Sequence, residues 1–109
     1  MALDAISRRC DHARVKAKLL IRERVVYPDG GLVEMVVWRL PRPVPPTSHG
    51  FKYRFVYVFD GRRVLGYDNE RGKGDHRHVD GVEERIRFTT IDDLLSQFVI
   101  EVEALRRRR

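Results

Sequence analysis

The chain has 109 residues, of which 42% are hydrophobic and 35% charged, and its formal net charge is +6. These values fit a single folded domain spanning residues 1–109 and exclude an intrinsically disordered chain. The basic excess, mostly arginine, favours a polyanion or an acidic protein as partner, although arginine-rich genomic composition alone could explain it. The single cysteine, Cys10, excludes an internal disulfide, and no segment approaches the ~20 apolar residues of a membrane span. We therefore expect a soluble cytoplasmic protein with no membrane partner.

The first third of the chain predicts a β-hairpin. Residues 1–9 suggest a short helix with apolar residues along one side. From about residue 13 to residue 27, apolar and basic residues alternate with a period of two, which is typical of a strand. Residues 28–31 read Pro-Asp-Gly-Gly and predict a turn, and a second strand is expected over residues 32–40.

A proline-rich connector precedes the third predicted strand. Residues 41–46 contain four prolines, which cannot donate to a sheet ladder, so we expect a stiff link between strands. Residues 51–59 alternate between an aromatic face and a face of lysine, arginine and valine. The aromatic face could stack nucleic-acid bases or fill the core under a helix, and we favour the core because this small chain needs large residues there.

The second half of the chain predicts two more strands and a helix. An Asp-Gly turn predicts a fourth strand over residues 62–68, and a short fifth strand is expected over residues 84–88. Threonines before Ile91 can cap a helix, whose apolar residues recur at helical spacing as far as Leu105. The predicted fold is α+β: an antiparallel sheet of four to five strands with a C-terminal helix packed on one face.

Residues 66–78, which read GYDNERGKGDHRH, concentrate ionisable groups in one short segment. They hold two of the four histidines, three carboxylates, three cations and three glycines, and are too polar to form a core. We interpret the segment as a loop that carries a functional site, and the alternative is a solvated surface loop. Glycines also allow a ligand to approach the backbone closely.

These groups suit RNA cleavage without a metal. His76 and His78 share a face if their segment is extended, and imidazoles can act as acid and base near neutral pH. Lys73 and Lys52 would stabilise charge on the phosphate, while the RNA 2′-hydroxyl acts as an internal nucleophile. No cofactor is therefore expected. Asp75 or Glu70 would orient an imidazole, and His49 could carry a third proton. The candidate catalytic residues are therefore His76, His78, Lys73, Asp75, Glu70 and His49. The substrate-binding candidates are their polar and basic neighbours: Lys52, Tyr53, Arg54, Tyr67, Asp68, Arg71 and Arg77.

A divalent metal is the alternative for the same segment. A His-x-His pair with the nearby carboxylates of Asp68, Glu70 and Asp75 could bind one, as in a metal-dependent nuclease. The spacing matches none of the strong zinc signatures, and the glycine pattern is neither a Walker loop nor a dinucleotide-binding motif. We therefore favour a site without a metal.

Residues 48–54 read SHGFKYR, and together with residues 66–78 they resemble the TumE-type family of toxins from toxin–antitoxin modules. The likeness extends from the basic strand at residues 16–20 to the helix around Phe98. It implies growth inhibition through RNA cleavage, and a cognate helix-turn-helix antitoxin as partner.

Two functions are consistent with these residues. The first is a toxin that acts as an endoribonuclease and cleaves cellular RNA by metal-independent acid–base catalysis. The alternative is a non-enzymatic basic module that binds nucleic acid or protein. RNA and the antitoxin are the expected partners, and a homodimer is also considered.

Overall fold

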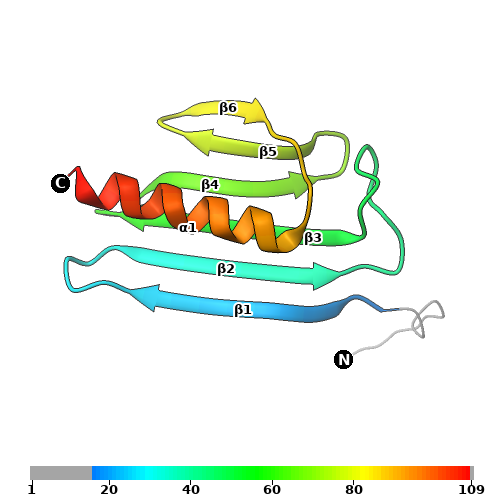
Figure 1. Cartoon of the computed structure of the whole chain (residues 1–109), viewed down its shortest axis with the longest axis horizontal. Coiled ribbons are helices and arrows are strands. Elements are labelled where there is room, and N and C mark those ends of the chain that lie inside the picture. The colour runs from blue at the N-terminus through cyan, green and yellow to red at the C-terminus, as the bar shows by residue number, and fades with distance from the viewer. Residues whose placement is uncertain (1–15, 109) are drawn as a thin grey trace.

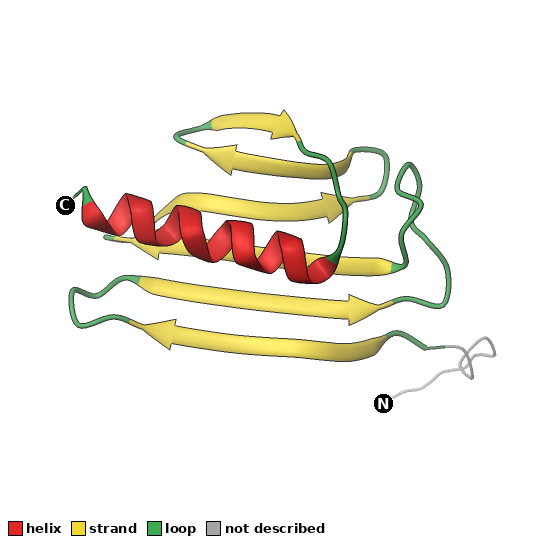
Figure 2. Cartoon of the chain, viewed as in Figure 1, coloured by secondary structure: helices red, strands yellow, loops and turns green. Residues whose placement is uncertain are grey.

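A computed structural model describes residues 16–108 and shows one antiparallel sheet with one helix lying across it (Figures 1 and 2). Neighbouring strands follow sequence order, so each pair is a hairpin or a simple reversal of the chain. The elements are β1 (Lys18–Val26), β2 (Leu32–Arg39), β3 (Phe51–Phe59), β4 (Arg62–Glu70), β5 (Gly74–Val79), β6 (Val82–Arg85) and α1 (Ile91–Arg107). The short helix expected over residues 1–9 lies outside the described residues.

The aromatic face of β3 forms the centre of the core. Tyr53, Phe55 and Tyr57 are buried beneath α1, so the prediction that these rings fill the core is confirmed. The ring of Phe98, on the helix, lies 5.5 Å from that of Phe55 and 5.2 Å from that of Tyr67, measured between centroids. Such aromatic pairs add to the stabilisation that burial provides. We call this side of the sheet the helix face.

Both ends of α1 have specific contacts. The Thr90 side chain accepts a hydrogen bond from the N–H of Asp93, which caps the first turn. At the other end, the Arg106 guanidinium lies 3.5 Å from the ring centroid of Tyr27 and 3.0 Å from a carboxylate oxygen of Asp29. Within residues 16–108 no element covers the opposite side of the sheet, which we call the open face (Figure 1). No helix in this part of the chain combines the length and apolar character needed to cross a membrane.

The predicted sheet and C-terminal helix are confirmed, but the sheet has six strands rather than four to five. The segment 66–78 is a hairpin and not a loop, because β4 continues to Glu70 and β5 returns after a turn at residues 71–73. The last strand, β6, begins earlier than expected, and residues 86–90 have no regular structure. Polar residues on both sides of β5 conceal the hydrophobic period from which strands are recognised.

The proline connector packs against the turn between β4 and β5. The N–H of Gly72 donates a hydrogen bond to the carbonyl of Pro45 at 3.0 Å. Gly74 has a φ of 79°, and a Cβ atom there would lie 3.2 Å from Cγ of Pro46. A side chain at Gly74 would therefore meet both backbone strain and a crowded neighbour.

Candidate functional site

Strand alternation divides the polar residues of β4 and β5 between the two faces of the sheet. Asp68 pairs directly with His76, and His78 follows two residues later on the same face. Asp75 and Arg77 alternate with these histidines and therefore point toward the helix face. Residues adjacent in the sequence thus belong to two separate clusters.

The cluster on the open face comprises Asp68, His76, His78 and Glu83, and we call it the open-face cluster. Nε2 of His76 lies 2.8 Å from Oδ1 of Asp68 and 3.1 Å from Oε2 of Glu83. Nε2 of His78 lies 3.6 Å from the same Asp68 oxygen, and the two imidazole centroids are 4.9 Å apart. The His76 side chain is 4% exposed and that of His78 18%, so only His78 is accessible to a large substrate.

Hydrogen bonding determines the tautomer of His76. Its Nδ1 lies 2.9 Å from the carbonyl oxygen of Gly74, which can only accept, so Nδ1 carries a proton. Nε2 of His76 and Oδ1 of Asp68 are both buried, and although they are close, neither has an aligned hydrogen-bond partner in the described structure. The site therefore contains two buried polar atoms that need a further partner.

Two arginines flank this cluster on the open face. Arg54 pairs with Asp68 across β3 and β4, and Arg85 pairs with His76 across β5 and β6. Both are exposed, and neither forms an ion pair with another residue in 16–108. Lys52 is on the same face of β3, and its ammonium group donates to the backbone carbonyl of Asn69. Each exposed guanidinium group can bind a phosphate through two parallel hydrogen bonds.

A third arginine on this face was not predicted from the sequence. A bulge in the β3–β4 pairing aligns Arg63 with Val58, which places it on the open face. Gly66 pairs with His78 across β4 and β5, and a Cβ atom at Gly66 would lie 3.1 Å from Cδ of Arg63. The arginine side chain therefore lies over Gly66, beside His78. The glycine inside β4 was the only available signal, since such a residue often marks a close approach.

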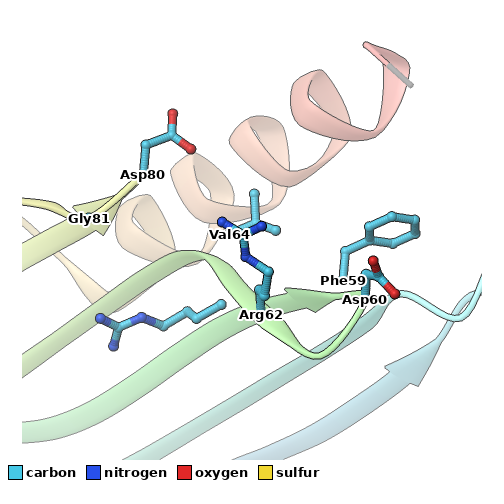
Figure 3. A pocket seen from close by; sticks show the side chains of 7 residues that line it. Phe59, Asp60, Arg62, Val64, Asp80 and Gly81 are labelled. Carbon is cyan, nitrogen blue, oxygen red and sulfur yellow. The ribbon is translucent and has the colours of Figure 1, made fainter.

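Arg63 also borders an open pocket of about 420 Å³ at the end of the sheet where two turns meet. Figure 3 shows side chains from the β3–β4 turn and the β5–β6 turn around it. The pocket contains cations and carboxylates but none of the four residues of the open-face cluster. Its lining residues are Phe59, Asp60, Arg62, Arg63, Val64, Asp80 and Gly81.

His49 belongs to a second histidine–carboxylate pair, on the helix face. Its Nε2 lies 2.8 Å from Oδ1 of Asp75, and its Nδ1 accepts a hydrogen bond from the N–H of Phe51. The imidazole stacks on Phe88 at 3.8 Å between centroids. Tyr53 donates its hydroxyl to the same carboxylate, and burial together with this bond raises the pKa of Tyr53 above its ordinary value. Both nitrogens of His49 are thus engaged within the protein.

Arg77 connects β5 to the helix rather than pointing to the open face. Its Nε lies 3.0 and 3.1 Å from the two carboxylate oxygens of Glu101, and its NH1 lies 2.7 Å from Glu84. The hydroxyl of Tyr67 also donates to Glu101. Burial raises the pKa of Glu101, but the hydrogen bonds from Arg77 and Tyr67 outweigh it and lower that pKa below its ordinary value.

Replacing Glu101 with glutamine is expected to lower the free energy of unfolding by about 2 kcal/mol at neutral pH, because Arg77 loses its charged partner. Because the pKa of Glu101 is lowered in the folded state, its ionised carboxylate stabilises the protein at pH values above the ordinary pKa of 4.5. This stabilisation is lost as the pH falls through the folded-state pKa. The difference between wild type and variant should therefore be constant from about pH 6 to 8 and shrink below about pH 4. Urea unfolding across this range measures it. Glu103→Gln, at an exposed position of the same helix, is the control, and an equal loss there would contradict the assignment.

The remaining candidates lie at one end of the open-face cluster. Arg71 and Lys73 are exposed in the β4–β5 turn, where the Lys73 ammonium lies 3.4 Å from Glu83. Glu70 lies 3.9 Å from Nε2 of His76. Partial burial raises the pKa of Glu83, but nearby Lys73 and His76 lower it overall. The open face therefore collects Lys52, Arg54, Asp68, Glu70, His76 and His78. The helix face holds His49, Tyr53, Tyr67, Asp75 and Arg77.

Comparison with known proteins gives one match. A family model described as Toxin TumE matches residues 4–106, which is nearly the whole chain. None of the curated proteins matches the chain, and neither does any solved structure.

Proposed function

Because the chain belongs to the TumE toxin family, we propose that it inhibits growth by cleaving cellular RNA on the open face of its sheet. The observation that carries this proposal is the pair of histidines that share Asp68 between two exposed arginines. Proton carriers and phosphate-binding cations are the groups that RNA cleavage by the 2′-hydroxyl requires. Besides its RNA substrate, the partner that we propose is a cognate helix-turn-helix antitoxin.

The exposure of the two histidines suggests different roles for them. His78 is the accessible ring, so we assign it as the base that removes the proton of the 2′-hydroxyl. The resulting oxygen attacks the adjacent phosphorus, and Arg54 and Arg85 stabilise the charge that accumulates on the phosphate. His76 is too buried to meet RNA directly, and with Asp68 it orients His78. Water supplies the proton that the departing 5′-oxygen takes up.

Cleavage by purified protein is expected to persist in EDTA and to leave 2′,3′-cyclic phosphate ends, because the internal nucleophile needs no activated water. The measurement is incubation with total RNA, with and without chelator, followed by analysis of the product ends. Complete loss in EDTA that Mg²⁺ or Mn²⁺ restores would instead assign the chemistry to metal-binding carboxylates such as Asp68 and Glu70. RNA that is bound but never cut would favour the non-enzymatic binding module.

A further inference from the structure

The buried Nε2 atom of His76 faces two carboxylates. Because Nδ1 carries the proton donated to Gly74, a neutral His76 ring presents a lone pair at Nε2. Oxygens of Asp68 and Glu83 lie opposite it at 2.8 and 3.1 Å. These atoms carry lone pairs that repel one another at such distances unless a positive species lies among them. The positive species between these atoms is either a proton or a bound metal cation.

We propose that Asp68, His76 and His78 bind a divalent transition-metal cation of the Zn²⁺ type. One ligand atom from each residue can be chosen so that all three lie within 4.8 Å of one another. Tetrahedral Zn²⁺ with ligands at about 2.1 Å places neighbouring ligand atoms about 3.4 Å apart. The observed 2.8 Å from Asp68 to His76 and 3.6 Å from Asp68 to His78 bracket that value, so small side-chain rotations suffice.

The surroundings of these ligands suit such a cation. Imidazole nitrogens with one carboxylate are a ligand set that Zn²⁺ and its neighbours in the transition series accept readily. Histidines that bind metals commonly donate their other N–H to a carbonyl or carboxylate, as His76 does to Gly74. The ligands come from two paired strands, which keep their backbone spacing fixed. Glu83 is close enough to serve as a fourth ligand or to orient a bound water.

The helix-face pair of His49 and Asp75 provides an internal comparison. Its nitrogen–oxygen distance is also 2.8 Å, and both side chains are about as buried as those of the three proposed ligands. There, however, both imidazole nitrogens already have partners, and Asp75 also accepts from Tyr53. A metal should therefore bind at the open face and not at this pair.

Metal binding has a consequence for the proposed RNA cleavage. A cation on His78 occupies the lone pair that would remove the proton of the 2′-hydroxyl. Zn²⁺ should therefore inhibit cleavage when it fills the site. This consequence rests on the proposed function, whereas the binding site itself rests only on the geometry of the three ligands.

Titration of the metal-free full-length protein with Co²⁺ tests the site directly. We expect one Co²⁺ per chain, visible absorption bands of a four-coordinate ion, displacement by one Zn²⁺ and a raised melting temperature. His78→Ala and Asp68→Asn should lower the affinity at least about tenfold, whereas His49→Gln should leave it unchanged. Circular dichroism establishes that each variant is folded. Absence of stoichiometric binding, or equal affinity in His78→Ala and wild type, would overturn the proposal and assign the charge to a proton.

RNA cleavage in the same samples separates this inference from the proposed function. Cleavage in EDTA that Zn²⁺ abolishes supports both. Cleavage in EDTA without any Co²⁺ binding refutes the metal site alone. Specific Co²⁺ binding without cleavage in any condition supports the site and refutes the ribonuclease.

Discussion

Replacing His78 with alanine is expected to reduce RNA cleavage by about 10²- to 10⁴-fold and to remove growth inhibition in cells that express the protein. His78 is the accessible imidazole of the open-face cluster, and its ring lies beside the carboxylate of Asp68. The variant keeps the aromatic core, because His78 projects from the face opposite to α1. The loss should therefore be found in the rate at saturating protein, with RNA affinity nearly unchanged.

The matched control for this variant is His49→Gln. His49 is also paired with an aspartate, but it lies on the helix face with both nitrogens engaged. It should retain cleavage, although the loss of stacking on Phe88 will reduce stability somewhat. Wild-type cleavage by the His78→Ala protein would remove His78 from the reaction. An equal loss in both variants, with melting temperatures lowered alike, would indicate damage to the fold.

Much of the fold could be predicted because local signals agree with one another. Residues 51–59 alternate strictly, and the turns before β2 and β4 carry the glycines and aspartates that tight reversals require. The capping residue Thr90 marks the start of α1. The sequence predicts a loop where the structure has β5, because the polar residues of this strand project to both faces. On one face, Arg77 contacts Glu101 of the helix, and on the other face, His76 belongs to the open-face cluster. Neither face therefore shows a hydrophobic period.

The candidate site could be predicted only in part from the sequence. The segment 66–78 does contain the histidines and Asp68, and their spacing allows a shared face. Which neighbours join them depends on the cross-strand register, which cannot be read from the sequence alone. Register brings in Arg85 and Glu83 from β6, and a bulge turns Arg63 onto the open face. The partner of His49, 26 positions away along the chain, likewise follows from tertiary pairing alone.

Replacing both Arg54 and Arg85 with alanine is expected to weaken RNA binding by about 10²- to 10³-fold at moderate salt, because each guanidinium contributes charge-assisted hydrogen bonds to phosphate. Each phosphate contact to a single strand contributes about 0.7 units to the slope of log affinity against log salt concentration. The double variant should therefore flatten that slope by about 1.4 units. Affinity measured across a salt series with catalytically inactive His78→Ala as background gives the slope without RNA degradation.

The control removes two positive charges elsewhere. Arg107 and Arg108 are exposed at the end of α1, on the helix side of the sheet, and their replacement by alanine changes the net charge equally. If RNA lies on the open face, this second pair should leave the salt slope almost unaltered, because exposed charges more than about 10 Å from a phosphate are largely screened. Equal flattening by both pairs would mean that general charge attracts RNA and that Arg54 and Arg85 form no specific phosphate site. A flattened slope for Arg54 and Arg85 alone would place the RNA backbone directly across Asp68 and His76, where His78 can reach a 2′-hydroxyl.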